Sequence, residues 1–218
     1  MKRFVVIGLG NFGAAVAESL HDAGHEVATL DRNEEAVDRM AHRVTRAAVG
    51  DGRNIEVLRR LGAEKADVGI VSTGDDITAS ILATLALRDL GVTELYVKVV
   101  SHDHARVLEK IGVTETVFPE RESGIRLATR VASSGILNYI RVGEGFGIQE
   151  MAVPESWLGR SLRSLELRRE FRISVVAVHD VLRNEMHPIP DPDAPLKESD
   201  TLLVLGRDAD LSAVARVR

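Results

Sequence analysis

The sequence has 218 residues, of which 44% are hydrophobic and 28% charged, the composition of a folded protein with one large or two small domains. It contains no cysteine, which excludes disulfides, thiolate metal sites and cysteine catalysis and fits a reducing compartment. The net charge of −5 argues against a nucleic-acid polymer as a general partner. No stretch of about 18 apolar residues occurs, and the N-terminus leads directly into a strand pattern, so we expect a cytoplasmic protein that does not span the membrane.

The N-terminal stretch predicts a nucleotide site. An apolar strand pattern at 4–7 leads into glycines spaced G-x-G-x-x-G and then into a segment with helical periodicity. Gly8 lets the chain turn off the strand, Gly10 lets a phosphate approach the backbone, and Gly13 lets the helix lie close to the sheet. The start of that helix offers free N–H groups to an anion. The contact residues expected in this turn are Gly8, Leu9, Gly10, Asn11, Phe12 and Gly13.

Asp31 ends the next apolar run, roughly 20 residues beyond the glycines, where a ribose-binding carboxylate is expected. It favours an adenosine ribose with free hydroxyls and would repel a 2′-phosphate. Arg32 softens that exclusion of NADP without removing it. The alternative is a glycine-rich turn in an α/β domain that binds nothing.

Strand patterns alternate with helical patterns through residue 118 and predict an α/β fold, a Rossmann-like, doubly wound parallel sheet. The strands are expected at 4–7, 27–30, 44–49, 66–72, 95–100 and 115–118, and the later helices at 34–41, from 54, at 77–90 and at 103–111. Ligands lie at the carboxyl ends of such strands. The turns expected to share one crevice are therefore 9–11, 31–33, 50–52 and 73–75.

The rest of the chain is expected to form a second, small domain. Residues 121–141 are expected to form one long helix, apolar all round at its end and therefore buried by a second domain or a second chain. Gly143, Gly145 and Gly147 form the expected hinge, so that the domains are 1–142 and 143–218. The second domain is expected to hold strands at 148–153, 173–178 and 201–205, a helix at 161–170, an irregular stretch at 184–200 and a last helix from 208.

Nearly the whole chain resembles the cytoplasmic regulatory subunits of bacterial Ktr/Trk potassium transport systems, which combine an RCK (KTN, TrkA-N) domain with a small α+β TrkA-C domain. The resembling segments are 7–13, 24–27, 31–33, 50–51, 70–76, 97–99, 107–112, 119–121, 137–140, 158–159, 165–168, 173–178, 190 and 200–206. The resemblance implies a gating subunit without enzymatic activity, peripheral on the inner membrane face. It implies a homodimer that assembles into an octameric ring, docked on a membrane-embedded K⁺-translocating subunit of the KtrB/TrkH type.

The family's ligands are ATP, ADP and NAD(H), and their binding changes the shape of the ring. Carried over by motif, the glycines would hold the phosphates and Asp31 the ribose, with Asn33 and Asp51 near the adenosine. Glu120 matches an acid that helps to hold a cation, divalent or monovalent, near the phosphates at the dimer interface. The helix that ends at 137–140 would be the crossover and dimer element. The further expected cofactor contacts are Arg32, Gly50, Thr73, Gly74 and Lys98.

Asn11 departs from the family, since the Ktr branch commonly has an arginine there that contacts the terminal phosphate of ATP. Asn11 cannot neutralise a triphosphate, which favours ADP or NAD over ATP. Arg168 matches a family position that contacts an effector, cyclic di-AMP in some members. The alternative for the arginine-rich stretch at 160–172 is a solvated helix face balanced by nearby glutamates.

Two further patterns have more than one interpretation. Lys98 lies in an apolar strand and either reaches an anion in the crevice or extends from the strand end into solvent. The sequence Ser-His-Asp-His at 101–104 is expected to cap a helix, with both histidines in solvent, rather than to bind a metal.

Two other functions are weighed against the gating subunit. A small NAD-dependent oxidoreductase would need a proton donor or acceptor beside the nicotinamide, and the sequence has no Ser/Tyr/Lys or His/Asp pairing at a suitable place. A redox-sensing DNA repressor would need a basic winged-helix segment, which the sequence lacks. The gating subunit is therefore the favoured function.

Overall fold

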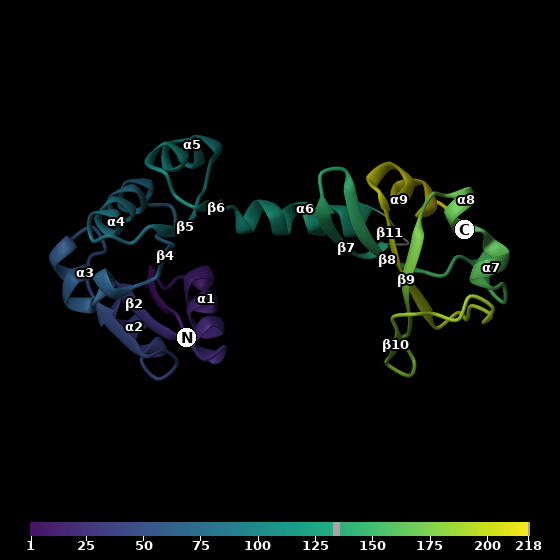
Figure 1. Ribbon diagram of the computed structural model, residues 1–218, viewed down its shortest axis with the longest axis horizontal. Helices are drawn as coiled ribbons and strands as arrows, with labels where there is room; N and C mark the ends of the chain where they lie inside the picture. The colour runs from purple at the N-terminus through teal and green to yellow at the C-terminus, as the bar shows by residue number, and fades with distance from the viewer. Residues whose placement is uncertain (133–135, 218) are drawn as a thin grey trace. The chain divides into compact units, whose positions relative to one another are not determined.

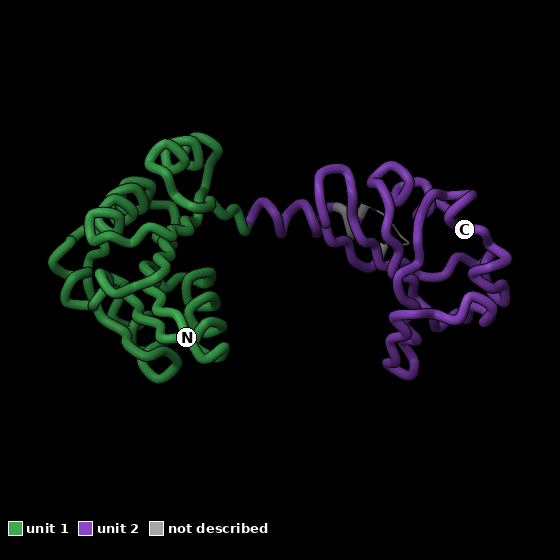
Figure 2. The backbone as a smooth tube through the Cα atoms, in the orientation of Figure 1, with its two compact units in different colours: residues 1–119 green, residues 120–218 purple. Residues whose placement is uncertain are grey.

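The computed structural model describes residues 1–132 and 136–217. Its backbone forms two compact units, Met1–Pro119 and Glu120–Arg218, each with its own sheet and hydrophobic core (Figure 2). Within the described ranges, no helix has both the length and the apolar character needed to cross a membrane.

The first unit is built on a parallel sheet with the strand order β3-β2-β1-β4-β5-β6. Helices lie around this sheet (Figure 1). Its strands are β1 (Arg3–Ile7), β2 (Glu26–Asp31), β3 (Arg46–Val49), β4 (Val68–Val71), β5 (Glu94–Lys98) and β6 (Glu115–Val117). Its helices are α1 (Asn11–Asp22), α2 (Glu34–Met40), α3 (Ile55–Leu61), α4 (Ile77–Asp89) and α5 (His102–Ile111), with a 3₁₀ turn, η1 (Ala63–Lys65). The sequence-predicted doubly wound sheet is confirmed. The strand order reverses beside β1, and a ligand crevice is expected at that point.

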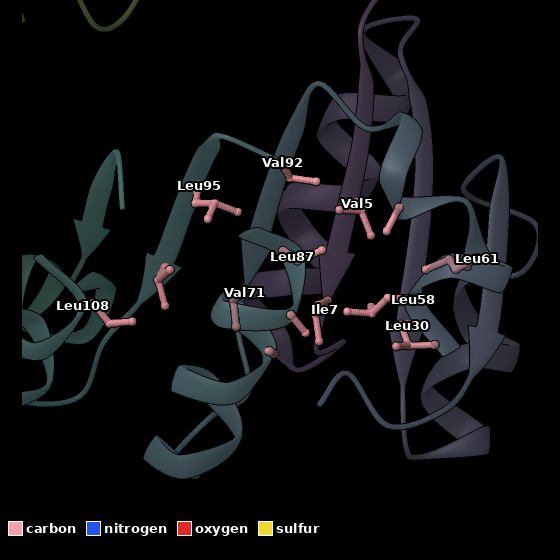
Figure 3. Packing of buried hydrophobic residues seen from close by; sticks show 14 of the residues in the cluster. Val5, Ile7, Leu30, Leu58, Leu61, Val71, Leu87, Val92, Leu95 and Leu108 are labelled. Atoms are coloured by element: carbon pink, nitrogen blue, oxygen red, sulfur yellow. The ribbon is translucent and has the colours of Figure 1, made fainter. Parts of the chain in front are cut away.

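Aliphatic side chains cover both faces of this sheet. On one face Val5 and Ile7 of β1 pack with Leu58 of α3 and Leu87 of α4 (Figure 3). On the other face Val6 packs with residues of α1 and α2. Successive β1 residues thus point to opposite sides, the alternation of a strand buried on both faces. This packing fixes the end of β1, where the glycine turn begins.

Side-chain caps set the start of the helices that follow β2, β3 and β4. Asn33 accepts a hydrogen bond from Ala36 N at the start of α2, and Asn54 accepts one from Glu56 N at α3. Asp76 accepts one from Ala79 N at α4. Each cap satisfies a backbone N–H that the helix itself leaves unpaired.

The second unit holds an antiparallel sheet with the strand order β10-β9-β11-β8-β7. Its strands are β7 (Ile136–Gly143), β8 (Phe146–Ala152), β9 (Ser174–Asp180), β10 (Glu185–His187) and β11 (Asp200–Arg207). Its helices are α6 (Pro119–Ala132), α7 (Leu162–Leu165), α8 (Leu167–Glu170) and α9 (Asp208–Val214), with a 3₁₀ turn, η2 (Glu155–Trp157). Met151, Trp157 and Leu202 lie in its core. The small α+β domain expected from the resemblance is therefore present.

The expected long helix over 121–141 is wrong in its second half. Helix α6 ends at Ala132, residues 133–135 lie outside the described residues, and 136–143 form strand β7. The strand pairs with β8, with Tyr139 opposite Gln149 and Ile140 opposite Ile148. The all-round apolarity that suggested a buried helix end belongs to a strand, in which neighbouring side chains point to opposite faces.

The expected hinge is also wrong, because its glycines belong to the hairpin between β7 and β8. Gly145 lies in the turn with φ +72°, a conformation that favours glycine. At Gly147 a Cβ would lie 2.4 Å from the ring of Tyr139, so the absence of a side chain allows the ring to pack there. The compact units divide at Pro119 and Glu120. A functional division at 142/143 stays a prediction, although residue 143 lies inside the hairpin.

The second unit differs from expectation in two smaller points. The single helix expected over 161–170 is divided into α7 and α8 by Glu166, whose φ of 45° does not fit a right-handed helix. The stretch at 184–200, expected to be irregular, contains the short edge strand β10.

Candidate functional site

A cavity of about 320 Å³ opens at the carboxyl ends of β1, β2, β3 and β4. Its lining residues are Ile7, Gly8, Gly10, Leu30, Asp31, Arg32, Gly50, Asp51, Gly52, Arg53, Ser72, Thr73, Gly74, Asp76, Ala79 and Ala83. All four turns that were expected to share a crevice contribute to it. The expected contacts that line it are Gly8, Gly10, Asp31, Arg32, Gly50, Asp51, Thr73 and Gly74.

The glycine turn is built around backbone contacts that exclude side chains. A Cβ on Gly8 would lie 2.0 Å from the carbonyl oxygen of Ser72, and a Cβ on Gly13 would lie 1.9 Å from that of Gly8. Gly10 differs, since nothing lies within 4 Å of its Cβ position. Gly10 is also the N-cap of α1, and no side chain caps that helix. The N–H groups at the start of α1 are therefore left for another acceptor.

Asp31 is held between β1 and β2 by two backbone donors. Leu9 N donates to Oδ2 at 2.5 Å, and Asn33 N donates to Oδ1 at 2.8 Å. These bonds fix the carboxylate beside the glycine turn, where a ribose hydroxyl would find an acceptor.

Asp51, in the turn after β3, is the centre of a charged group. It accepts hydrogen bonds from Arg53 Nε at 3.0 Å, from Arg53 Nη2 at 2.6 Å and from the Arg53 backbone N at 3.0 Å. Arg32 Nη2 donates to the same carboxylate at 3.2 Å. The hydrogen bonds from the Arg53 side chain and then from the Arg53 backbone, followed by the Arg32 charge, hold the pKa of the Asp51 carboxyl far below its usual range.

Sequence reasoning missed Arg53 as a site residue. The signal was present, since Arg53 directly follows the expected contacts Gly50 and Asp51 on the same turn. Asp76 was not among the expected contacts, yet its Oδ2 lies 3.9 Å from Arg32 Nη1. Both residues line the cavity.

Several expected contacts lie outside the cavity lining. Leu9 is 4% exposed and belongs to the core under α1 and α2. Asn33 serves as the cap of α2, and Asn11 is the exposed first residue of α1. Phe12 and Lys98 line a different groove, of about 350 Å³, on the sheet face that carries α1.

The expected sites of the second unit lie in α6 and α8. Glu120 is in the first turn of α6, and its role in holding a cation stays a prediction. Arg168 lines a cavity of about 710 Å³ together with Arg163 and Arg169. Arg163 pairs with Asp193 and Arg169 with Glu166, whereas Arg168 has no such partner within the described part of the chain.

The cluster at 101–104 caps a helix, as expected, but one histidine is buried. Ser101 Oγ accepts a hydrogen bond from His104 N at the start of α5. His104 is 2% exposed, and neither ring nitrogen has a hydrogen-bond partner among the described residues. The expectation that both histidines face solvent is therefore wrong for His104. Across 1–132 and 136–217, no group of three or more His, Cys, Asp or Glu side chains is arranged to hold a metal ion.

Comparison with known proteins finds a matching family model for each of the two units. Residues 4–119 match the family model of the TrkA-N domain, and residues 148–217 match that of the TrkA-C domain. The chain is 32% identical to Ktr system potassium uptake protein A of Bacillus subtilis (strain 168) over 210 residues, 96% of this chain and 94% of that protein. It is 35% identical to Ktr system potassium uptake protein C of the same organism over 211 residues, 97% of this chain and 95% of that protein.

Among solved structures, the chain aligns with the crystal structure of the GsuK RCK domain with a TM-score of 0.69 and 20% identity. The alignment covers 99% of this chain and 47% of that one. At this identity the likeness concerns the fold.

Proposed function

The chain belongs to the Ktr family of potassium uptake proteins, with a TrkA-N domain at 4–119 and a TrkA-C domain at 148–217, and on that premise we propose its function. It is the nucleotide-sensing regulatory subunit of a bacterial potassium uptake system. It catalyses no reaction. It lies in the cytoplasm, at the inner face of the membrane.

The observation that carries the proposal is the glycine turn facing the cavity. Gly10 has open space where a side chain would be, and the uncapped start of α1 follows it. Backbone N–H groups and the partial positive charge of the helix end suit a phosphate group. Asp31 is fixed one strand away, at the spacing of a ribose acceptor. The ligand class is therefore an adenine nucleotide, ADP or ATP, or NAD(H).

Regulation requires that the ligand bind two shapes of the assembly with different affinities, since equal affinities shift no equilibrium. The partner is a membrane-embedded K⁺-translocating subunit, and the assembly is a homodimer that builds an octameric ring. Helix α6 supports self-association because Leu127 and Val131, four residues apart on one face, are 50% and 72% exposed. The family resemblance further suggests that Glu120, in the first turn of α6, helps to hold a cation.

A second effector site is proposed in the TrkA-C domain. Arg168 lines the cavity there and is not engaged by an acid in the described part of the chain. A guanidinium that is not engaged by an acid can bind a phosphodiester oxygen. The family resemblance suggests cyclic di-AMP as the ligand.

The alternative, a small NAD-dependent oxidoreductase, finds little support in the cavity. The described residues that line it include no histidine, tyrosine or lysine. A hydride transfer that creates or consumes an alcohol needs such a proton donor or acceptor within hydrogen-bond reach.

Isothermal titration with ATP, ADP and NADH, with and without Mg²⁺, tests the proposal. We expect at least one of these ligands to bind, and light scattering to report a change in the assembly on binding, without cofactor turnover. Failure of every ligand to bind would mean that the glycine turn is structural and that the proposed function is wrong.

A further inference from the structure

Two arginines lie at the ribose end of the nucleotide cavity, and acids hold both of them. Arg32 directly follows Asp31 at the end of β2, and Arg53 lies in the turn after the neighbouring strand, β3. Arg32 Nη2 lies 3.2 Å from Asp51 Oδ1, and Arg32 Nη1 lies 3.9 Å from Asp76 Oδ2. Arg53 donates hydrogen bonds to both carboxylate oxygens of Asp51. All five side chains line the cavity.

The neighbours Asp31 and Arg32 are compatible with two kinds of nucleotide. In dinucleotide-binding sheets of this type, an acid about 20 residues beyond the glycines accepts a hydrogen bond from the ribose 2′-hydroxyl, whereas an arginine nearby can accommodate a 2′-phosphate. This chain has both residues, side by side. Which nucleotide the cavity accepts therefore depends on whether Arg32 is free to bind a phosphate.

Asp31 is ready to accept the hydroxyl. Its two oxygens each accept one backbone hydrogen bond, from Leu9 N and from Asn33 N. A carboxylate oxygen can accept more than one hydrogen bond, so each keeps capacity for a ribose hydroxyl. Because the two donors belong to the backbone, the carboxylate is held in place independently of Arg32.

The charges that line the cavity oppose a 2′-phosphate. Among the described lining residues, three are acids and two are arginines. A phosphate monoester carries about −1.5 to −2 charge at pH 7 and would enter beside this excess of carboxylates. The ion pairs themselves are weak, since the side chains of Arg32 and Asp51 are 49% and 34% exposed. The exclusion therefore depends on the balance of charge, and Asp51 is the acid that contacts both arginines.

We propose that Asp51 is a specificity-determining residue of the cavity: by engaging Arg32 and Arg53 it keeps both guanidiniums from a 2′-phosphate, and so selects adenine nucleotides with a free 2′-hydroxyl. ADP, ATP and NAD(H) have this hydroxyl, whereas NADP(H) carries the phosphate. The choice is thus made by a residue of the turn after β3 together with Asp31. This inference rests on the proposed function, because it concerns the same cavity and the same placement of the ligand.

The test compares ligands that differ only in the 2′-phosphate. One pair is 5′-AMP and adenosine 2′,5′-bisphosphate, and the other is NADH and NADPH, each titrated calorimetrically into the full-length protein. The measured quantity is the preference, which is the ratio of the two affinities within a pair. We expect the wild type to bind the member with the free 2′-hydroxyl at least about tenfold more tightly.

Asp51→Asn should lower this preference about tenfold, because it removes one negative charge and releases the two guanidiniums while keeping the size of the side chain. Asp51→Ser also removes the charge and should act in the same direction, so that the result does not depend on one variant. Asp22→Asn is the matched control, since Asp22 is an exposed acid at the end of α1 and does not line the cavity. It should leave the preference unchanged.

Arg32→Ala tests whether Asp51 acts through the arginine. In the wild-type background we expect it to change the preference by less than about threefold, because Arg32 is already engaged. In the Asp51→Asn background it should restore most of the preference, because the released guanidinium is then absent. The effect of Arg32→Ala must therefore be larger when Asp51 has been replaced.

The outcomes separate this inference from the proposed function. If the wild type binds 5′-AMP or NADH but shows no preference, or if Asp51→Asn and Asp51→Ser keep the wild-type preference, the inference is wrong and the proposed function stands. An equal effect of Arg32→Ala in both backgrounds also contradicts the inference, since Asp51 would then not control Arg32. If the wild type binds no ligand of either pair and neither ADP nor ATP, the proposed function fails first.

Discussion

The glycines at 8, 10 and 13 share one motif but have different surroundings. Gly8 has φ +93°, and a Cβ there would overlap a backbone carbonyl of the next strand end. A Cβ on Gly13 would overlap the carbonyl oxygen of Gly8. At Gly10 the space is open. The first two are therefore required by the fold, whereas Gly10 leaves open space, into which the proposed ligand would approach.

Alanine substitutions should separate these roles. Gly8→Ala and Gly13→Ala are expected to lower the free energy of unfolding by about 3 kcal/mol or more, because the new methyl group meets backbone at about 2 Å. Gly10→Ala should change that free energy by no more than about 0.5 kcal/mol and still weaken nucleotide binding on the order of tenfold. Thermal denaturation and titration calorimetry measure the two effects. Unchanged binding in Gly10→Ala would contradict the assignment.

His104 is a buried base without a hydrogen-bond partner in the described chain. Burial lowers its pKa below the ordinary value of 6.5. Above pH 6.5 the imidazole is neutral in both the folded and the unfolded chain. As the pH falls from 6.5 through the folded pKa, the unfolded chain takes up a proton that the folded chain excludes, and stability is lost.

His104→Leu should remove this acid sensitivity. The leucine has a similar volume and no unpaired nitrogen, so we expect it to raise the free energy of unfolding by about 1 kcal/mol at pH 7. The decline in stability from pH 7 to pH 5 should become shallower. Urea denaturation across this range measures both, with the exposed His42→Leu as the control. An identical decline in His104→Leu and wild type would show that His104 is not the titrating group.

At the scale of elements, β7 joins the sheet of the second unit and is tied to the last helix. Tyr139 Oη donates to Asp208 Oδ1 at 2.7 Å, at the start of α9. Burial, followed by this hydrogen bond, raises the pKa of Tyr139 to about 12. The bond joins two elements that are 69 residues apart in the chain.

Tyr139→Phe should lower the stability of the second unit by about 1 kcal/mol at pH 8, the usual contribution of one hydrogen bond. Because the folded pKa lies above the unfolded value of 10, the contribution of the hydroxyl is complete below pH 10 and is lost as the pH rises toward 12. The difference between the two proteins should therefore shrink in alkaline denaturation experiments. A constant difference up to pH 12 would contradict this role of Tyr139.

At the scale of the molecule, α6 presents apolar side chains to solvent. Soluble proteins rarely leave such a stripe open unless it takes part in an interface. The proposed dimer and ring would cover it.

The double variant Leu127→Glu, Val131→Glu should lower the mass measured by multi-angle light scattering. Burying two carboxylates in an apolar interface costs more free energy than the interface contact contributes. Arg126→Ala is the control on the same helix, and its mass should equal that of the wild type. An unchanged mass in the double variant would mean that self-association does not depend on this face of α6.

The sequence by itself determined the first unit and its turns. The strand before Gly8, the acid at the end of β2 and the helices that begin near residues 54 and 77 are local signals, and each is where the pattern predicts it. Local periodicity, glycine conformation and side-chain capping depend on neighbours within a few residues, and this is why they can be predicted. Because ligands lie at the carboxyl ends of parallel strands, the four turns could be predicted to share one cavity.

Only the tertiary structure decided which of these residues meet. Residues 136–140 become a strand because β8 offers a pairing edge, and no local pattern carries that information. Arg32 reaches Asp51 and Asp76 across the sheet, contacts of 19 and 44 positions in sequence. Charged side chains on exposed turns follow no periodic pattern. Which of them pair depends on the order of the strands in the sheet and on the length of the side chains. The glycine turn is thus encoded in the sequence, whereas the charges over the cavity are set by the fold.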